Sequence, residues 1–341
     1  MRTLGNAAAR GRTAFALAAL AAGLLLAGSA GASEVVVYSA RSHYGQEPAI
    51  DAFTKKTGIQ VKSHGGNSSE LFERLRAEGD KTPADVLITV DAGNLWNAAQ
   101  AGLLAKTDSP EIAANIPAHL RDPQNRWTAL TVRARTIMYS TKKVKPEELS
   151  TYEALADPKW KNRICLRNSG HVYNQSLLAT MIRRGGEPKV EALVRGWVAN
   201  NPTLINGDTK ILESIAAGQC DVGITNTYYL ARILAKDPAF PVAPFWANQQ
   251  TTGTHVNVSG AGITAHAKNR ANAVKLIEFL TSPEAQQMFA DGNFEYPANP
   301  QAAANPILVK WGKFKQDDIN VAAAGEFQAA ATKLADRAGY K

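Results

Sequence analysis

The sequence predicts an α/β protein of two lobes, and three observations support this expectation. Short β-branched, apolar runs alternate with segments whose apolar residues recur at helical spacing, which is typical of a mostly parallel sheet covered on both faces. Roughly 300 residues remain beyond an amino-terminal export signal, more than a typical single core holds. The second half of the chain repeats the pattern of the first half without repeating its sequence, which indicates a second lobe.

Residues 1–32 have the pattern of a secretory signal peptide. Three arginines precede an apolar run at 14–27, and small residues at 30–32 suit cleavage. The run is shorter than the ~20 residues that a membrane-spanning helix needs, and no later segment comes closer. We therefore expect a mature protein that starts near Ser33, is exported to the periplasm of a bacterium and has no stable membrane insertion.

The charge of the mature chain is mildly positive. Removing the three signal arginines takes the formal net charge from +8 to +5. The basic residues are scattered, without the basic stripe and interleaved aromatics that nucleic-acid binding requires. We therefore expect no nucleic-acid partner and interpret these residues as a solvated surface.

The first half of the mature chain predicts three strands, each followed by a helix. Asn67 and Glu70 resemble a capping box, in which Asn67 caps the helix and Glu70 returns to the backbone of Asn67. In chain order the expected elements are a strand at 34–38, a helix at about 47–56, a strand at 59–61, a helix that opens at 67–70, a strand at 83–88 and a helix at 95–101.

The second half predicts further strands and helices of the same kind. Ser282, followed by Pro283 and Glu284, has the pattern of a helix start. In open α/β sheets, ligands bind at the carboxyl ends of strands, where the segments 38–44 and 225–229 lie. The other expected elements are strands at 163–166, 221–224 and 260–264, and helices at 175–182, 211–217 and 271–280.

Cys165 and Cys220 each lie in an expected strand of a chain that we expect in an oxidising compartment. Disulfides persist in such compartments. Neither cysteine has a nearby His or second Cys in the sequence, so a thiol metal site or a nucleophile is disfavoured. We expect a structural disulfide, although spacing alone does not establish its geometry.

The polar groups at the expected strand ends are mostly phenols: His43, Tyr44, Tyr173, Tyr228 and Tyr229. A phenolate is a hard oxygen ligand, and the pKa of an unperturbed phenol is about 10. Only a strongly Lewis-acidic cation displaces that proton near neutral pH, and ferric iron fits best, because calcium and magnesium call for carboxylates and carbonyls. From spacing alone, packing remains the more common role of such tyrosines.

Three segments carry a resemblance to a known family: HY at 43–44, RNSGHVYNQS at 167–176 and NTYY at 226–229. They resemble the periplasmic ferric-iron-binding proteins of ABC importers, in the transferrin-like branch of the type II solute-binding fold. The resemblance covers nearly the whole mature chain. Weaker support comes from PADV at 83–86, RAR at 133–135 and SPEAQ at 282–286.

The resemblance implies a two-lobe type II periplasmic binding protein fold with a hinged ligand cleft. The chain would cross between the lobes near 130–136 and 256–262. The expected division is a signal peptide at 1–32, the N-lobe at 33–132 and 257–302, the C-lobe at 133–256 and its carboxyl-terminal helices at 303–341.

The resemblance also assigns the site residues. It makes Tyr173, Tyr228 and Tyr229 phenolate ligands of ferric iron, and His43 and Tyr44 closing ligands from the opposite lobe. The expected anion site, with carbonate as the expected synergistic anion, consists of Arg133 and Asn226.

One position departs from the family pattern. Some relatives have a glutamate after the Asp-Val strand, where this chain has Val90 followed by Asp91. That carboxylate ligand is missing, so the charge balance must come from phenolates or the anion. The departure leaves two roles open for His43, which either ligates the metal or orients Tyr44.

The expected function is a monomeric periplasmic binding protein that captures ferric iron and delivers it to an inner-membrane ABC permease, without catalysis. One alternative is a binding protein for another small anion or a polyamine. Another is an iron-tyrosinate hydrolase, which needs an open coordination position and additional His and Asp ligands. The six histidines are scattered, without HxD or HxxxH spacing, which disfavours the hydrolase.

Overall fold

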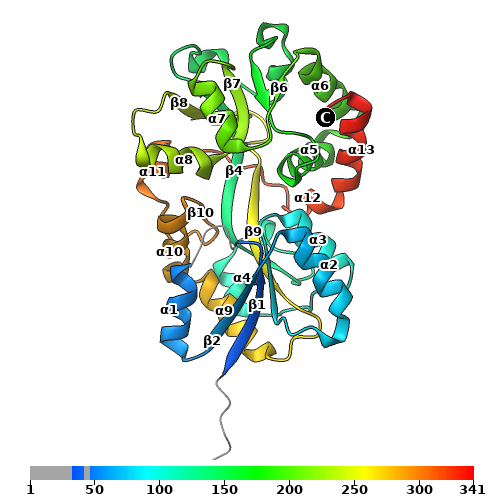
Figure 1. The fold of residues 1–341 in the computed structure, drawn as a ribbon, viewed down its shortest axis with the longest axis vertical. Coiled ribbons are helices and arrows are strands. Elements are labelled where there is room, and N and C mark those ends of the chain that lie inside the picture. The colour runs from blue at the N-terminus through cyan, green and yellow to red at the C-terminus, as the bar shows by residue number, and fades with distance from the viewer. Residues whose placement is uncertain (1–32, 42–46) are drawn as a thin grey trace, which may run out of the picture. The chain divides into compact units, whose positions relative to one another are not determined.

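One long strand, β4 (Thr128–Ser140), runs through both lobes of the protein, and β9 (Val256–Ile263) lies beside it (Figure 1). The computed structural model describes residues 33–41 and 47–341. The first part of β4 pairs antiparallel with β9, while the last part of β4 pairs with strands of the second lobe. The sheet order is β2-β1-β3-β9-β4-β7-β5-β6, so β4 and β9 connect a parallel sheet in the N-lobe to one in the C-lobe.

The N-lobe sheet is covered on both faces by helices. Val35 of the first strand packs in one cluster with Phe53, and Val36 packs in another with Leu71. Neighbouring side chains of a strand point to opposite faces, so both faces are buried. The strands are β1 (Glu34–Ser39), β2 (Gln60–Gly65) and β3 (Val86–Thr89), and the helices are α1 (Pro48–Thr57), α2 (Ser68–Glu78), α3 (Ala92–Gln100), α4 (Pro110–Asn115), α9 (Arg270–Thr281) and α10 (Pro283–Asn293).

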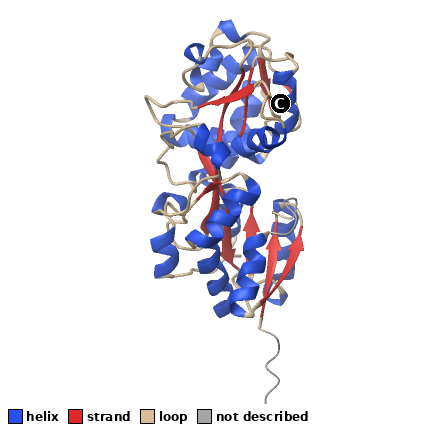
Figure 2. Ribbon diagram, turned by 90° about the vertical axis from the view of Figure 1, so that its left-hand side faces the viewer, coloured by secondary structure: helices blue, strands red, loops and turns tan. Residues whose placement is uncertain are grey.

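The C-lobe has the same layered construction around its own core, in which Trp160 and Trp197 are fully buried. Figure 2 shows the strands flanked by helices in this lobe as in the first. The strands are β5 (Ile164–Leu166), β6 (Thr203–Leu204), β7 (Val222–Asn226) and β8 (Val242–Phe245), and the helices are α5 (Val172–Gly185), α6 (Glu187–Ala199), α7 (Asp208–Ala216), α8 (Thr227–Lys236) and α13 (Gln328–Ala338).

The carboxyl-terminal segment contacts both lobes. Its helix α12 (Ala323–Glu326) packs against α3 and α5, and Val321 lies in the N-lobe core. The division of the chain into lobes at the boundaries given above stays a proposal. The remaining elements are β10 (Tyr296–Pro297), α11 (Pro306–Lys310) and short 3-10 turns at Gly79–Lys81, Ala118–Leu120, Pro146–Glu148, Glu153–Ala156 and Pro158–Trp160.

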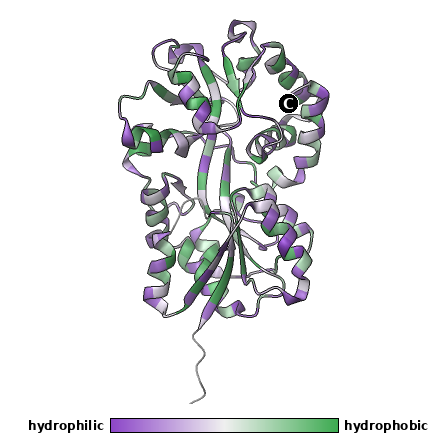
Figure 3. Ribbon diagram, viewed as in Figure 1, coloured by the Kyte–Doolittle hydropathy of each residue, from purple (hydrophilic) through white to green (hydrophobic). Residues whose placement is uncertain are grey.

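Hydrophobic residues concentrate on the strands, while the helices carry hydrophilic residues as well (Figure 3). This pattern is expected where helices cover a sheet and expose their other side to water. Among the helices that the structure describes, none is both long and apolar enough to cross a membrane.

Two helix starts predicted from the sequence are confirmed. Asn67 accepts a hydrogen bond from the backbone N–H of Glu70, whose carboxylate accepts one from the backbone N–H of Asn67, which completes the capping box. Ser282 caps α10 by accepting from the N–H of Ala285, with Pro283 in the first turn. These local signals act over three or four residues, so they do not depend on the tertiary fold.

Cys165 on β5 and Cys220, just before β7, form a disulfide in the structure. Their Cα atoms lie 5.8 Å apart, and both residues belong to a buried cluster that includes Ile211 and Ile215. The bond links two neighbouring strands of the C-lobe sheet.

Titration of the denatured, unreduced mature protein is therefore expected to find no free sulfhydryl. Reduction should then reveal two thiols and lower stability by about 4 kcal/mol on the chain-entropy account, because the cross-link closes a loop with a sequence separation of 55. Two free thiols before reduction would contradict the assignment.

Candidate metal centre

Two adjacent tyrosines lie where β7 passes directly into α8. Asn226 is the last residue of the strand and the N-cap of the helix, so Tyr228 and Tyr229 lie in the first helical turn. Their ring centroids are 4.3 Å apart. Tyr228 is buried and Tyr229 is half-buried. The chain leaves the strand at this point, as the sequence predicts. The positive end of the α8 dipole lies here and favours a negative charge on the phenol oxygens.

Tyr173 joins this pair from another helix start. It lies in the first turn of α5, and its hydroxyl is 3.2 Å from the hydroxyl of Tyr228. His171 caps α5 by accepting the backbone N–H of Tyr173 on Nδ1, at 3.2 Å. Burial, with the charge of Arg167 and other guanidiniums, lowers the pKa of His171 to about 3, so the imidazole stays a neutral acceptor. Two helix starts thus bring three phenols together.

Guanidinium groups surround the Tyr173 ring. The Cζ atoms of Arg133, Arg135 and Arg167 lie 5.3, 6.0 and 5.6 Å from its centroid. The pKa of Tyr173 is nevertheless raised, first by burial and then by the charge of Tyr229, against the opposing effect of Arg133. The phenol is therefore protonated near neutral pH in the metal-free protein, and a bound cation must displace that proton.

Asp208, the first residue of α7, anchors this arrangement. Its buried carboxylate accepts hydrogen bonds from Arg135 at 2.9 Å, from the backbone N–H of Asn226 at 3.0 Å and from Arg167 at 3.3 Å. Sequence reasoning missed Asp208. Its only local signal is an acid at a helix start after Gly207, which does not reveal its partners.

Asn226 mediates between Arg135 and the phenols. Its side-chain oxygen accepts from Arg135 at 3.1 Å, and its amide nitrogen lies 3.4 Å from the Tyr228 hydroxyl. Arg135 also donates to the Asn174 side-chain oxygen at 2.8 and 3.1 Å. The anion role expected for Asn226 stays a prediction, while the structure places this residue as a support for Tyr228.

Arg133 on β4 is buried and forms an ion pair with Asp91. Its NH2 lies 3.1 Å from the Asp91 carboxylate, while its NH1 is buried without a hydrogen-bond partner. Asp91 also accepts from Ser176 of α5 at 2.8 Å and from Asn257 of β9 at 3.0 Å. Burial raises the pKa of Asp91, and Arg133 opposes that rise. The hydrogen bonds of the Asp91 carboxylate thus link the start of α3 in the N-lobe to α5 in the C-lobe.

The predicted ligands His43 and Tyr44 lie outside the described residues. The two residues that flank their segment, Arg41 and Glu47, form an ion pair at 2.7 Å. Arg41 also pairs with Glu295 at 2.9 Å. Within 33–41 and 47–341, no group of three or more His, Cys, Asp or Glu side chains is placed to hold a metal ion.

Comparison with known proteins places the chain in a family. The model of the family described as "Bacterial extracellular solute-binding protein" matches residues 81–320. The chain belongs to this family. It is 44% identical to iron uptake protein A1 of Synechocystis over 90% of this chain and 88% of that protein, and 30% identical to the Fe(3+)-binding periplasmic protein of Serratia marcescens over 86% and 88%.

Solved structures of similar sequence have the same fold. A Trichodesmium protein (IdiA, FutA) in complex with iron and citrate ligands superposes with a TM-score of 0.86, at 42% identity over 91% of this chain and all of that one. The apo ferric ion-binding protein A of Pasteurella haemolytica gives 0.83, at 37% identity over 91% and 98%. The resemblance and the two-lobe α/β fold expected from the sequence are confirmed.

Proposed function

We propose that the protein captures ferric iron in the periplasm and delivers it to an inner-membrane ABC permease. The main observation in support is that Tyr173, Tyr228 and Tyr229 lie close together at the starts of two helices. Relatives whose names refer to iron uptake and ferric-iron binding support it. The protein would act as a monomer and without catalysis, after removal of the signal peptide at 1–32.

The three phenols would coordinate the iron as phenolates. Ferric iron offsets the cost of ionising phenols whose burial opposes ionisation. The helix dipoles and the nearby guanidiniums then stabilise the phenolate charge. His43 and Tyr44 would complete the coordination from the N-lobe, and carbonate would serve as the synergistic anion at Arg133.

Metal analysis tests this function directly. Mature protein is incubated with ferric nitrilotriacetate, separated from free iron by gel filtration and assayed for iron. The proposal predicts one ferric ion per chain, retained through the column. Protein that emerges without iron, and that instead binds a polyamine or another small anion by calorimetry, would contradict the proposal in favour of the alternative ligand class.

Arg133→Ala is expected to weaken iron retention about tenfold or more in bicarbonate buffer, and less in buffer stripped of bicarbonate. The buried NH1 has no partner in the structure and is free to hold an oxyanion, and a hydrogen bond to a charged group contributes ~1.5–3 kcal/mol. Iron retention is measured by competition with a chelator in both buffers.

The matched control for this change is Asp91→Asn. It disrupts the same ion pair with Arg133 but keeps the guanidinium, so it should preserve the dependence on bicarbonate. An equal loss for Arg133→Ala in both buffers would show that Arg133 acts only through its contacts between the strands.

A further inference from the structure

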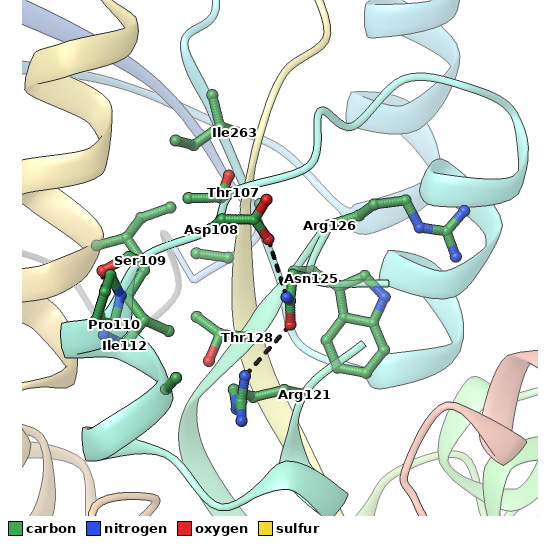
Figure 4. Close-up of a pocket in the computed structure, with 15 residues that line it drawn as sticks. Thr107, Asp108, Ser109, Pro110, Ile112, Arg121, Asn125, Arg126, Thr128 and Ile263 are labelled. Carbon is green, nitrogen blue, oxygen red and sulfur yellow. Dashed lines mark hydrogen bonds between the residues drawn. The ribbon is translucent and has the colours of Figure 1, made fainter. Parts of the chain in front are cut away.

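A cavity of about 230 Å³ lies in the N-lobe and includes none of the phenols in its lining. It lies between α4, the segment before β4, the end of β9 and α9 (Figure 4). A cavity of that volume suits a small organic molecule.

Part of the wall is aliphatic and part is polar. Ile112, Ile263 and Ile277 line the cavity from three different elements. Arg121, half-buried, reaches the cavity beside Thr128, at the start of β4 (Figure 4). A ligand that fills such a cavity needs an apolar body and one polar end.

The polar end of the cavity offers unused hydrogen-bonding capacity. Arg121 donates through Nε to the backbone carbonyl of Ile116 at 2.9 Å and through NH1 to the Asn125 side chain at 3.3 Å. The hydroxyl of Thr128 and the indole N–H of Trp127 are buried, and both lack a hydrogen-bond partner. Such groups are rare in folded proteins, because each loses its bonds to water without replacing them.

The charges around the cavity favour an anion. Arg126 is neutralised by Asp122 at 2.7 Å, and Asp108 at the rim pairs with Lys106 at 2.9 Å. Among the residues that the structure describes, no carboxylate forms an ion pair with Arg121. Asn125, which accepts from Arg121, donates to Asp108 at 3.1 Å, so a neutral amide separates the guanidinium from the nearest carboxylate of the lining. Arg121 is thus the cation of the lining that no direct ion pair compensates.

We propose that this cavity binds a small aliphatic carboxylate. The carboxylate accepts hydrogen bonds from Arg121 and from the Thr128 hydroxyl, and the alkyl chain packs against the three isoleucines. A guanidinium matches a carboxylate in shape and charge, and the apolar wall selects for chain length. The proposal concerns the N-lobe alone and does not rest on iron binding.

Calorimetric titration of the mature, iron-free protein with hexanoate tests the proposal. Saturable 1:1 binding is expected, about fifteenfold tighter than that of butyrate, because each of two further buried methylenes contributes about fourfold. Hexylamine, which has the same chain and the opposite charge, should not bind. No saturable binding of hexanoate at millimolar concentration, or equal binding of hexylamine, overturns the proposal.

Two variants locate the ligand. Arg121→Gln should weaken hexanoate binding tenfold or more, and Ala113→Trp, at an exposed position on the rim, should block access. The thermal transition of Ala113→Trp should match that of the wild type. Unchanged hexanoate affinity in both variants overturns the proposal.

The double variant Tyr228→Phe with Tyr229→Phe separates this site from the iron site. It should bind hexanoate as the wild type does. Loss of hexanoate binding in this variant would show that the carboxylate occupies the iron site, which would overturn the N-lobe proposal and leave the iron function standing.

Discussion

The double variant Tyr228→Phe with Tyr229→Phe is expected to lose tight ferric-iron binding and the visible colour of the loaded protein. Phenylalanine keeps the ring contact, in which the centroids lie 4.3 Å apart, and removes only the two oxygens. Tyr228 also loses its hydrogen bonds with Tyr173 and Asn226, and a typical hydrogen bond contributes about 1 kcal/mol. The thermal transition should therefore stay close to that of the wild type.

The matched control for this variant is Tyr139→Phe. Tyr139 is a phenol on the distal part of β4 that packs against the C-lobe core, away from the site. Its oxygen should be dispensable for iron binding and colour. If the double variant still bound ferric iron with an unchanged absorption band, the paired phenols would be structural and the proposed function would be wrong.

Asp208→Ala is expected to lower the free energy of unfolding by about 3–5 kcal/mol, the usual cost of breaking a buried ion pair by removing one partner. The change leaves the guanidiniums of Arg135 and Arg167 without their shared carboxylate. It also removes the acceptor of the Asn226 backbone N–H, which supports the start of α8. Denaturant unfolding measures the loss of stability.

An exposed ion pair provides the comparison. Glu284 pairs with Lys56 at 2.9 Å, with both side chains largely in water, so Glu284→Ala should cost less than about 1 kcal/mol. If Asp208→Ala were no more destabilising than Glu284→Ala, the buried network would not support the fold as described. Asp208→Asn, which keeps the shape, should fall between the two.

Local signals made part of the fold and site predictable. Asn67 and Ser282 act within one helical turn, and their helices begin where the sequence predicts. Tyr228 and Tyr229 are adjacent, so a turn at the strand end was enough to bring them together. Tyr173, 55 residues away from Tyr228, was a candidate because of its place after an expected strand, but its role as a ligand beside Tyr228 came only from the resemblance to a family.

The supporting network could not be predicted, because its partners lie far apart in the sequence. Asp208 is 73 residues from Arg135, and Ser176 is 85 residues from Asp91. Spacing carries no information about such pairs. β4 was also not recognised as one long strand, since its buried Arg133 and Arg135 interrupt the apolar pattern and are neutralised only by distant carboxylates.

The absorption spectrum of the mature protein during titration with ferric ion, together with the number of protons released, tests most directly whether the phenols bind iron as phenolates. Light drives electrons from phenolate oxygen to Fe(III), so a visible band should grow until one iron is bound per chain. Binding should release protons, because the phenols must ionise and burial raises the pKa of Tyr173. Acidification should abolish the band, since protons compete for the same oxygens. A protein that takes up ferric ion without a visible band and without proton release would contradict the account.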